Sequence, residues 1–450
     1  MATPIVTTRI LRRLLSGGVH SRAERLLARM HPADLGPVLA SLRPDEIRLI
    51  VDMLFRQRRA AATLRELPPE LLPQIFEAVP DERLASVFAR LEIDDRVELV
   101  NALPDERRDD VLSLMPDDKS EELRSAERYR PGSAGQVMTT SYLALDAKMT
   151  AQEAIDSVRG AAEKIESILY LYVVDDERRL LGVVPIRRLV AAAPHTPVSD
   201  LMVREPVHAM VEDDQEDVAQ LVARYDLLAI PVTDVDGTMV GVITVDDVID
   251  VITEEATEDM YHLAGLSDED RVFTSARVSF RKRLPWMMLN LVTVFAAATV
   301  MRLFAPTLER VIALAFFLPV VAGMSGNSGI QSLTVVTRAI ALGELEFSSG
   351  LRAMAKEVAV SVAIGACTGV FGGAIAWGLQ ENPYIGVVLF AAMLLTMGVA
   401  GMLGAGVPLL LKALRLDPAL GSGVIVTTAT DAFGFFTFLG IATLMLDRIA

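Results

Sequence analysis

The chain has 450 residues, 52% of them hydrophobic, and a formal net charge of −16. Its mean hydropathy of +0.38 is too high for an ordinary soluble enzyme. Residues 284–450 contain eight Lys or Arg and eight Asp or Glu, so the whole negative charge belongs to residues 1–283. Such an acidic part argues against nucleic acid and anionic lipid as partners and favours cations. The single cysteine, Cys367, excludes a disulfide framework and a thiolate metal site.

Residues 1–130 are predicted to form an acidic, all-α N domain. A helix start carrying proline or acidic residues recurs about every 12 residues, and aliphatic residues follow it at helical spacing. Short helices of this kind bury their apolar faces by stacking, which predicts a helical superhelix. The repeated segments begin at Arg43, Pro68, Pro80, Ile93 and Pro104.

Residues 131–253 contain an internal repeat, with copies at 131–197 and 198–253. Each copy has the pattern of an amphipathic helix, a β-branched strand, a charged turn, a second strand and a closing helix. The strand–turn–strand part reads YLYVVDDERRLLGVV in the first copy and AIPVTDVDGTMVGVI in the second. This arrangement resembles a pair of CBS domains, an α/β fold that often serves as a ligand-controlled regulatory module.

The resemblance to CBS domains implies a nucleotide motif, Gly-h-h-(Ser/Thr)-x-x-Asp, whose Asp holds a ribose. The second copy keeps this motif as Gly241, Thr244 and Asp247. In the first copy, Pro185 and Arg188 occupy the hydroxyl and Asp positions. The resemblance therefore implies a nucleotide site at Thr244 and Asp247 and leaves ATP open as a cofactor.

Residues 254–283 are predicted to form one connecting helix that ends in Arg281-Lys282-Arg283. Its acidic residues lie on neighbouring turns, where like charges cost about 0.2–0.5 kcal/mol per pair. That cost favours a bound cation or a basic partner near the helix, and a freely solvated linker helix is the alternative. The acidic residues crowded on these neighbouring turns are Glu254, Glu255, Glu258 and Asp259.

Residues 284–450 are predicted to form a transmembrane domain of five helices. Lys and Arg gather before the first apolar run and in the joints after the second and fourth. By the positive-inside rule, the N-terminal domains are cytoplasmic and the C-terminus is outside, in a multi-pass plasma or inner membrane protein. The five runs cover about 284–304, 311–337, 357–379, 384–411 and 420–446.

The fifth run contains Asp431, which at 1.5 Å per helical residue lies about 3 Å from the middle of the run. A carboxylate at this depth is energetically costly, and no Lys or Arg stands near enough in the run to pair with it. A transported or bound cation is therefore favoured, and a buried structural carboxyl is the alternative. Thr427 and Thr428 can bond backbone carbonyls and bend the helix beside it.

The second run contains Pro319 and then the sequence GMSGNSGIQS. Proline removes a backbone donor, and the glycines permit close approach or local unwinding, which would let carbonyls and amide side chains line an ion path near Gly326, Asn327 and Gln331. Small-residue helix packing is the alternative. One carboxylate with hydroxyls, amides and carbonyls suits a hard cation that retains its water, as Mg²⁺ does.

The order of parts, together with GMSGNSGIQS and TTATDAFGF, resembles the MgtE-type magnesium channels over essentially the whole chain. The resemblance implies a homodimer in the lipid bilayer whose pore runs between the second and fifth helices. Asp431 matches the pore aspartate that holds hydrated Mg²⁺. Ile330 departs from the pattern, because some members carry a second amide there. Residues implied around the pore are Asn327, Gly326, Thr427, Thr428 and Gln331.

The same resemblance implies that cytosolic Mg²⁺ binds acidic clusters and holds the pore closed. The matching positions lie in the N domain, the CBS pair, the connecting "plug" helix and the segment before the fifth helix. They are Asp94, Glu98, Asp214, Glu216, Asp226, Asp247, Asp250, Glu255, Glu258, Asp259 and Asp417.

Two other functions remain open at this point. One is a secondary transporter of Co²⁺, Mn²⁺ or Ni²⁺ in which Asp431 couples to protons, and the other is a membrane-anchored cation sensor. Catalysis has little support, because the five histidines show no metal-ligand spacing. The sequence also lacks a nucleophile elbow, a P-loop and a dinucleotide fingerprint.

Overall fold

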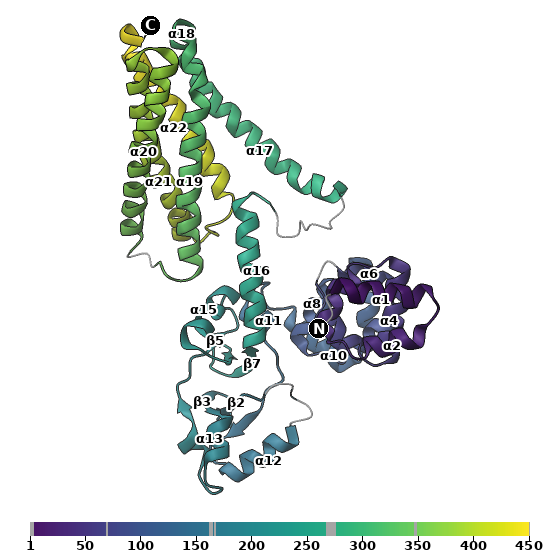
Figure 1. The fold of residues 1–450 in the computed structure, drawn as a ribbon. Helices are drawn as coiled ribbons and strands as arrows, with labels where there is room; N and C mark the ends of the chain where they lie inside the picture. Colours follow the sequence, from purple (N-terminus) through teal and green to yellow (C-terminus); the bar gives the residue numbers. More distant parts are fainter. Residues whose placement is uncertain are drawn as a thin grey trace. The chain divides into compact units, whose positions relative to one another are not determined.

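The computed structural model describes residues 4–68, 71–161, 165, 168–266, 276–345 and 349–449, with side chains from residue 7 onward. The chain divides into two compact units, Met1–Ile252 and Thr253–Ala450, and each is described by itself. Figure 1 shows the elements of both in sequence colours.

The N domain is helical, as the recurring helix starts predict. Pro80, Pro104 and Pro116 directly precede helices, and acidic residues fill the first turns, where their charge is favourable beside unpaired N–H groups. The apolar faces form one core in which the rings of Phe76 and Phe88 meet edge to face. The helices are α1 (Pro4–Ser16), α2 (His20–Leu27), α3 (Leu35–Leu39), α4 (Pro44–Arg56), α5 (Ala60–Arg65), α6 (Leu72–Ala78), α7 (Asp81–Phe88), α8 (Ile93–Asn101), α9 (Asp105–Ser113) and α10 (Asp117–Ala126), with a 3₁₀ turn at Pro32–Asp34.

The two CBS copies each form a small sheet with helices, which confirms the predicted α/β pair. In both, a parallel pair of strands is followed by an antiparallel one, in the orders β1-β2-β3-β4 and β5-β6-β7. The first copy comprises α11 (Ala134–Val137), β1 (Ala144–Asp146), α12 (Ala151–Ala161), β2 (Tyr170–Val174), β3 (Leu180–Pro185) and α13 (Ile186–Ala191). The second comprises α14 (Val198–Leu201), β4 (Val203–Arg204), β5 (Ala209–Met210), α15 (Gln215–Tyr225), β6 (Ala229–Thr233), β7 (Met239–Thr244) and α16 (Val245–Leu263).

The copies exchange their first segments. Strand β4, which opens the second copy, pairs with β3 of the first, and Thr139 of the first copy bridges to Val242 in β7 of the second. Gly182 and Gly241 stand at these crossings. A Cβ at Gly182 would lie 2.7 Å from the carbonyl oxygen of Val203, and one at Gly241 would lie 2.9 Å from that of Thr139. Glycine is needed at both positions because another backbone passes there.

Helix α16 joins the closing helix of the second CBS copy to the predicted connecting helix. No glycine or proline interrupts residues 245–263, so the helix is continuous. It ends at Leu263 rather than near residue 280, because Gly265 adopts a left-handed φ of +68°. Arg281, Lys282 and Arg283 lie in the next helix, and residues 267–275 of the predicted connection lie outside the described residues.

Within the described residues, five helical segments are long and apolar enough to cross a membrane, as predicted. Helices α19 to α22 run side by side (Figure 1). Gly401 of α21 packs against Ser361, and Gly404 packs against the Gly329 carbonyl of α19, so the fourth-helix glycines serve close packing. The elements are α17 (Ala276–Leu303), α18 (Ala305–Arg310), a 3₁₀ turn at Ile312–Phe316, α19 (Leu318–Ala341), α20 (Gly350–Gln380), α21 (Pro383–Ala413), α22 (Ser422–Leu444) and α23 (Leu446–Ile449).

Candidate functional site

Helix α19 carries the GMSGNSGIQS sequence without unwinding. It is one continuous helix, so its backbone carbonyls are engaged in helical hydrogen bonds and its side chains are the groups free to offer contacts. Asn327 and Gln331 are exposed on one side. On the other side Ser325, Ser328 and Ser332 are buried. Of the two alternatives, close approach and local unwinding, the structure shows close approach, at Gly329. The proline falls in the first turn, where helices tolerate it.

Helix α22 places Asp431 half-buried near the middle of a spanning segment. The Thr427 hydroxyl donates to the carbonyl oxygen of Gly423 at 2.9 Å, which confirms the predicted bonding of threonine to the backbone. The helix stays continuous through this region. The hydroxyl oxygen of Thr428 is buried and has no hydrogen-bond partner within the described residues. Asp431 has no hydrogen bond or ion pair in the same described part of the chain.

Helices α19 and α22 approach closely through small residues. A Cβ at Gly329 would lie 2.7 Å from Cγ1 of Val426 and 3.5 Å from Cγ2 of Thr430. One at Gly434 would lie 3.5 Å from Cγ1 of Val321. The helix bearing Asp431 thus packs directly on the helix bearing Asn327.

A second acidic region lies where the N domain meets the CBS pair. Burial and the nearby charges of Asp247, Asp95 and Glu92 raise the pKa of Asp94 to about 8. Oδ1 of Asp94 is buried and has no hydrogen-bond partner among the described groups. Burial also raises the pKa of Asp247, whose Oδ2 accepts a 2.6 Å hydrogen bond from Thr244. The fold thus brings two predicted ligands together at an energetic cost that a cation would relieve.

Asp250, one turn after Asp247 on α16, belongs to the same region. Burial, Asp246 and Glu66 raise its pKa. Glu66, Glu92 and Asp246 were not predicted as site residues. Glu66 directly follows α5 and Glu92 directly precedes α8, both far from residue 250 in sequence, so the sequence carried no signal for these contacts.

Other predicted ligands are placed elsewhere. Asp214 accepts a 2.9 Å hydrogen bond from Arg130 and also caps α15, so its carboxylate already has protein partners. Asp226 ends α15 with a left-handed φ of +51°. Glu98 lies on an exposed side of α8, one turn from Asp94. Glu216 accepts a weak bond from Gln220 at 3.5 Å.

The end of α16 forms a third acidic region, within the membrane unit. Burial, Asp417 and Glu255 raise the pKa of Asp259 to about 6. Nδ1 of His262 lies 2.8 Å from Oδ2 of Asp417 and 3.7 Å from Oε1 of Glu258. His262 was not predicted as a site residue, because no spacing pattern links it to Asp417.

Across the described ranges, no three His, Cys, Asp or Glu side chains converge as a group that could hold a metal ion.

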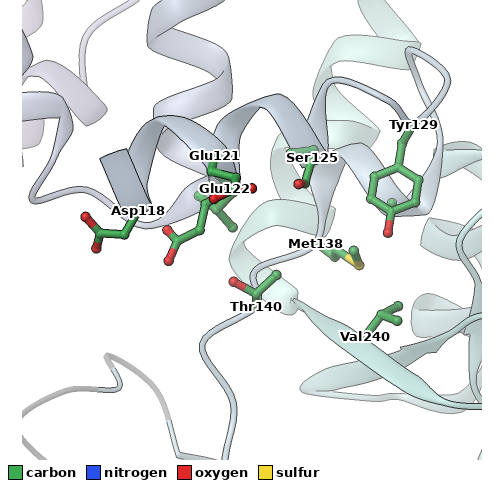
Figure 2. Close-up of a pocket in the computed structure, with 11 residues that line it drawn as sticks. Asp118, Glu121, Glu122, Ser125, Tyr129, Met138, Thr140 and Val240 are labelled. Atoms are coloured by element: carbon green, nitrogen blue, oxygen red, sulfur yellow. The ribbon is translucent and has the colours of Figure 1, made fainter. Parts of the chain in front are cut away.

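Within residues 1–252, the described part of the chain has a cavity of about 550 Å³ beside α10 (Figure 2). Asp118 and Glu121 of α10 lie on one side, with Tyr129, Met138 and Val240 on the other. None of the predicted site residues lines this cavity.

Five apolar helices, a central carboxylate in one of them, and an attached CBS pair with crowded acidic residues are typical of a membrane protein that handles cations. Comparisons with known proteins agree part by part. A divalent cation transporter family called MgtE matches residues 318–441, the MgtE intracellular N domain matches 30–132, and CBS domains match 134–195 and 198–254.

Two relatives extend over nearly the whole chain. Magnesium transporter MgtE of Bacillus subtilis is 34% identical over 428 residues, covering 92% of this chain and 95% of the relative. Magnesium transporter MgtE of Thermus thermophilus is 34% identical over 445 residues, covering 98% of each. The chain therefore belongs to the MgtE family of magnesium transporters, which are not enzymes.

Solved structures match the part that precedes the membrane helices. One is the soluble part of a magnesium transporter, at 29% identity and a TM-score of 0.52, covering 56% of this chain and 99% of the other. Another is the cytosolic domain of the Mg²⁺ channel MgtE in complex with ATP, at 33% identity and a TM-score of 0.52, covering 54% and 99%.

Proposed function

We propose that this chain conducts Mg²⁺ passively across the plasma or inner membrane, along α19 and α22 at the axis of a homodimer. The observation that carries this proposal is Asp431, a half-buried carboxylate in a spanning helix with no ion-pair partner in the described part of the chain. A carboxylate in that setting needs a countercharge, and a transported cation supplies one.

The surroundings of Asp431 favour a hydrated, oxygen-seeking ion. Asn327 and Gln331 carry exposed amide groups on α19, the helix that packs on α22. Thr427, one turn before Asp431, keeps its oxygen available as an acceptor while its proton bonds the Gly423 carbonyl. Mg²⁺ dehydrates reluctantly, so one carboxylate can select it by charge and hydrated size. Ile330 offers no such oxygen, which places more of the selectivity on Asp431.

Flux into liposomes tests this role. Purified protein carrying Asp431→Asn or Asp431→Ala should lose Mg²⁺ flux while keeping the elution profile of the wild type. Asp447→Asn is the matched control, because it removes the same charge at an exposed position outside the long helix. Full flux in a folded Asp431→Asn protein would refute the proposal.

The same assay on the wild type separates the alternative functions. Flux that needs a pH gradient, or that prefers Co²⁺, Mn²⁺ or Ni²⁺, would favour the secondary transporter. No flux at all would favour the sensor.

We further propose that cytosolic Mg²⁺ closes this path by binding the acidic regions around Asp94–Asp247, Asp250 and Asp259–Asp417. Carboxylates that are buried among like charges favour a bound divalent cation, because it removes their mutual repulsion. Glu255 and Glu258 extend the region at the end of α16.

Patch recordings from inside-out membranes test the gating. Neutralising Glu255, Glu258 and Asp259 together should leave current flowing when Mg²⁺ on the cytoplasmic face is high. Asp176→Asn, at an exposed turn of the first CBS copy, should be inhibited like the wild type. Unchanged inhibition in the triple variant would contradict the proposed gating.

Two further assignments belong to this proposal. The C-terminus lies outside the cell, and a cysteine placed there by Ala450→Cys should react with an impermeant thiol reagent in intact cells; Cys367 is first replaced by Ser.

We also propose that Thr244 and Asp247 hold the ribose of ATP, as the resemblance of this segment to CBS domains implies. Titration calorimetry with ATP should give binding that Asp247→Ala removes.

A further inference from the structure

The end of α16 meets the start of α22 in a tight set of contacts around Trp286 of α17. Trp286 is half-buried, whereas the three residues that follow it are exposed. Its six-membered ring lies 3.8 Å from a Cβ position at Gly265 and 3.0 Å from one at Gly421. The indole therefore sits between the turn that ends α16 and the turn that precedes α22.

Glycines make this arrangement possible. Gly265 and Gly421 adopt left-handed φ values of +68° and +62°, which side chains rarely allow. Gly423 lies in the first turn of α22, where a Cβ would collide with the carbonyl oxygen of Leu263, the last residue of α16. We call Trp286, Leu263, Gly265, Gly421 and Gly423 the clamp.

The clamp also touches the other pore helix. The Cδ1 atom of Ile330 on α19 lies 3.7 Å from the Cβ position of Gly423. The hydrogen bond between His262 and Asp417, at 2.8 Å, joins the same two segments beside the clamp. All of these contacts are between protein atoms, so they hold α16 to α22 without a bridging metal ion.

Asp431 is eight residues after Gly423 in the same uninterrupted helix, about 12 Å along its axis at 1.5 Å per residue. Because the helix is unbroken between the two residues, a displacement at Gly423 can be carried along its axis to Asp431. We propose that Trp286 and Gly423 are positioning residues for the pore, which fasten the end of α16 to the start of α22 and pass the movement of α16 to Asp431. This proposal rests on the Mg²⁺-gated conduction proposed above.

Gly423→Ala and Trp286→Ala should separate the two helices. In inside-out patches we expect the Mg²⁺ concentration for half inhibition to rise about tenfold in either variant, the size of a moderate coupling between sites. Single-channel current at low Mg²⁺ should stay near the wild-type value. Trp286→Phe retains an aromatic ring and should restore much of the inhibition. A purely structural defect would lower the number of channels without moving the half-inhibiting concentration.

Gly378→Ala is the matched control, since a Cβ at that position in α20 meets nothing within 4 Å. A second readout does not depend on gating. In a Trp377→Phe background Trp286 is the sole tryptophan, because the chain has two. Quenching of its fluorescence by acrylamide in EDTA should be weak, and Gly423→Ala should strengthen it.

The outcomes separate the two proposals. If the wild type is not inhibited by Mg²⁺, the proposed gating fails, and the quenching result alone decides whether the clamp holds. If the wild type is inhibited and Gly423→Ala shifts neither the half-inhibiting concentration nor the quenching, the clamp is overturned. If Gly423→Ala increases the quenching but leaves inhibition by Mg²⁺ unchanged, the proposed role of the clamp is also overturned, because the clamp would then open without affecting the pore.

Discussion

Nδ1 of His262 at the end of α16 lies 2.8 Å from Oδ2 of Asp417 in the connection between α21 and α22. The same carboxylate raises the pKa of Asp259, one turn before His262. The Asp417 carboxylate therefore lies close both to the imidazole of His262 and to the acidic side chain of Asp259. A cation bound by the two carboxylates would compete with the imidazole for Asp417.

Replacing His262 should weaken the membrane unit when Mg²⁺ is absent. A hydrogen bond from imidazole to a carboxylate contributes about 1 kcal/mol, so His262→Leu should lower the unfolding temperature in EDTA by a few degrees. Mg²⁺ should reduce this difference in unfolding temperature between His262→Leu and the wild type, because it can bind the Asp417 carboxylate in place of the imidazole. Tryptophan fluorescence during heating is a suitable measurement, since Trp286 and Trp377 both lie in this unit. His208→Leu, in the other unit, should leave the transition unchanged. Equal transitions for His262→Leu and the wild type would contradict the contact's role.

Asp94 should make the stability of the first unit depend on pH. Its pKa is about 8 in the folded protein against 3.8 without the fold, so between these values the folded state retains a proton that the unfolded state releases. The contribution of Asp94 to the free energy of unfolding is therefore greatest below pH 4 and falls as the pH rises toward 8. Asp94→Asn mimics the protonated form and removes the fall.

In EDTA at pH 9, Asp94→Asn should unfold at a higher temperature than the wild type, by a free energy of about 1 kcal/mol or more. At pH 4 the two should coincide. Differential scanning calorimetry of the full chain measures this, with the exposed Asp118→Asn as control. If the wild type instead unfolds at a higher temperature than Asp94→Asn at pH 9 in EDTA, the ionised Asp94 is not destabilised by its acidic neighbours.

Gly241→Ala should disrupt the crossing of the two CBS copies. The added Cβ would lie 2.5 Å from Sδ of Met138 and 2.9 Å from the Thr139 carbonyl oxygen, and the backbone cannot swing aside as a flexible side chain can. Overpacking of this kind costs about 1–3 kcal/mol. Gly160→Ala, where a Cβ meets nothing within 4 Å inside α12, should be neutral or stabilising by up to about 1 kcal/mol. If calorimetry gives a lower unfolding temperature for Gly160→Ala than for Gly241→Ala, the close approach of the Thr139 backbone to Gly241 is contradicted.

Arg96 should be essential to the N domain. It is 1% exposed, and its guanidinium donates to the carbonyl oxygens of Phe88 at 3.0 Å and Leu91 at 2.7 Å and to Glu122 at 3.1 Å. Arg96→Met removes this donor from all three acceptors, of which the Phe88 carbonyl and Glu122 keep a second donor, and should cost about 1–3 kcal/mol. Arg159→Met removes only an exposed pair and should cost less than about 1 kcal/mol, as judged by thermal unfolding.

Sequence alone determined the elements, because their signals are local. Helix starts in the N domain, the strand–turn–strand rhythm of the CBS copies and the five apolar runs all depend on residues within one or two turns of each other. The predicted connecting helix ran past Leu263 although a local signal stood there, because a glycine such as Gly265 commonly ends a helix in the left-handed conformation. Asp431 was also identified from the sequence, because a charge within an apolar run needs no tertiary contact to be recognised.

Only the tertiary structure decided which acidic residues meet. Composition placed many carboxylates in the first 283 residues, but packing set Asp94 beside Asp247 and gave Asp214 to Arg130. His262 and Asp417 are 155 residues apart, and no periodicity connects them. Contacts of this kind arise when separate helices bury their faces against each other, so their partners depend on the whole fold and not on any single stretch of the chain.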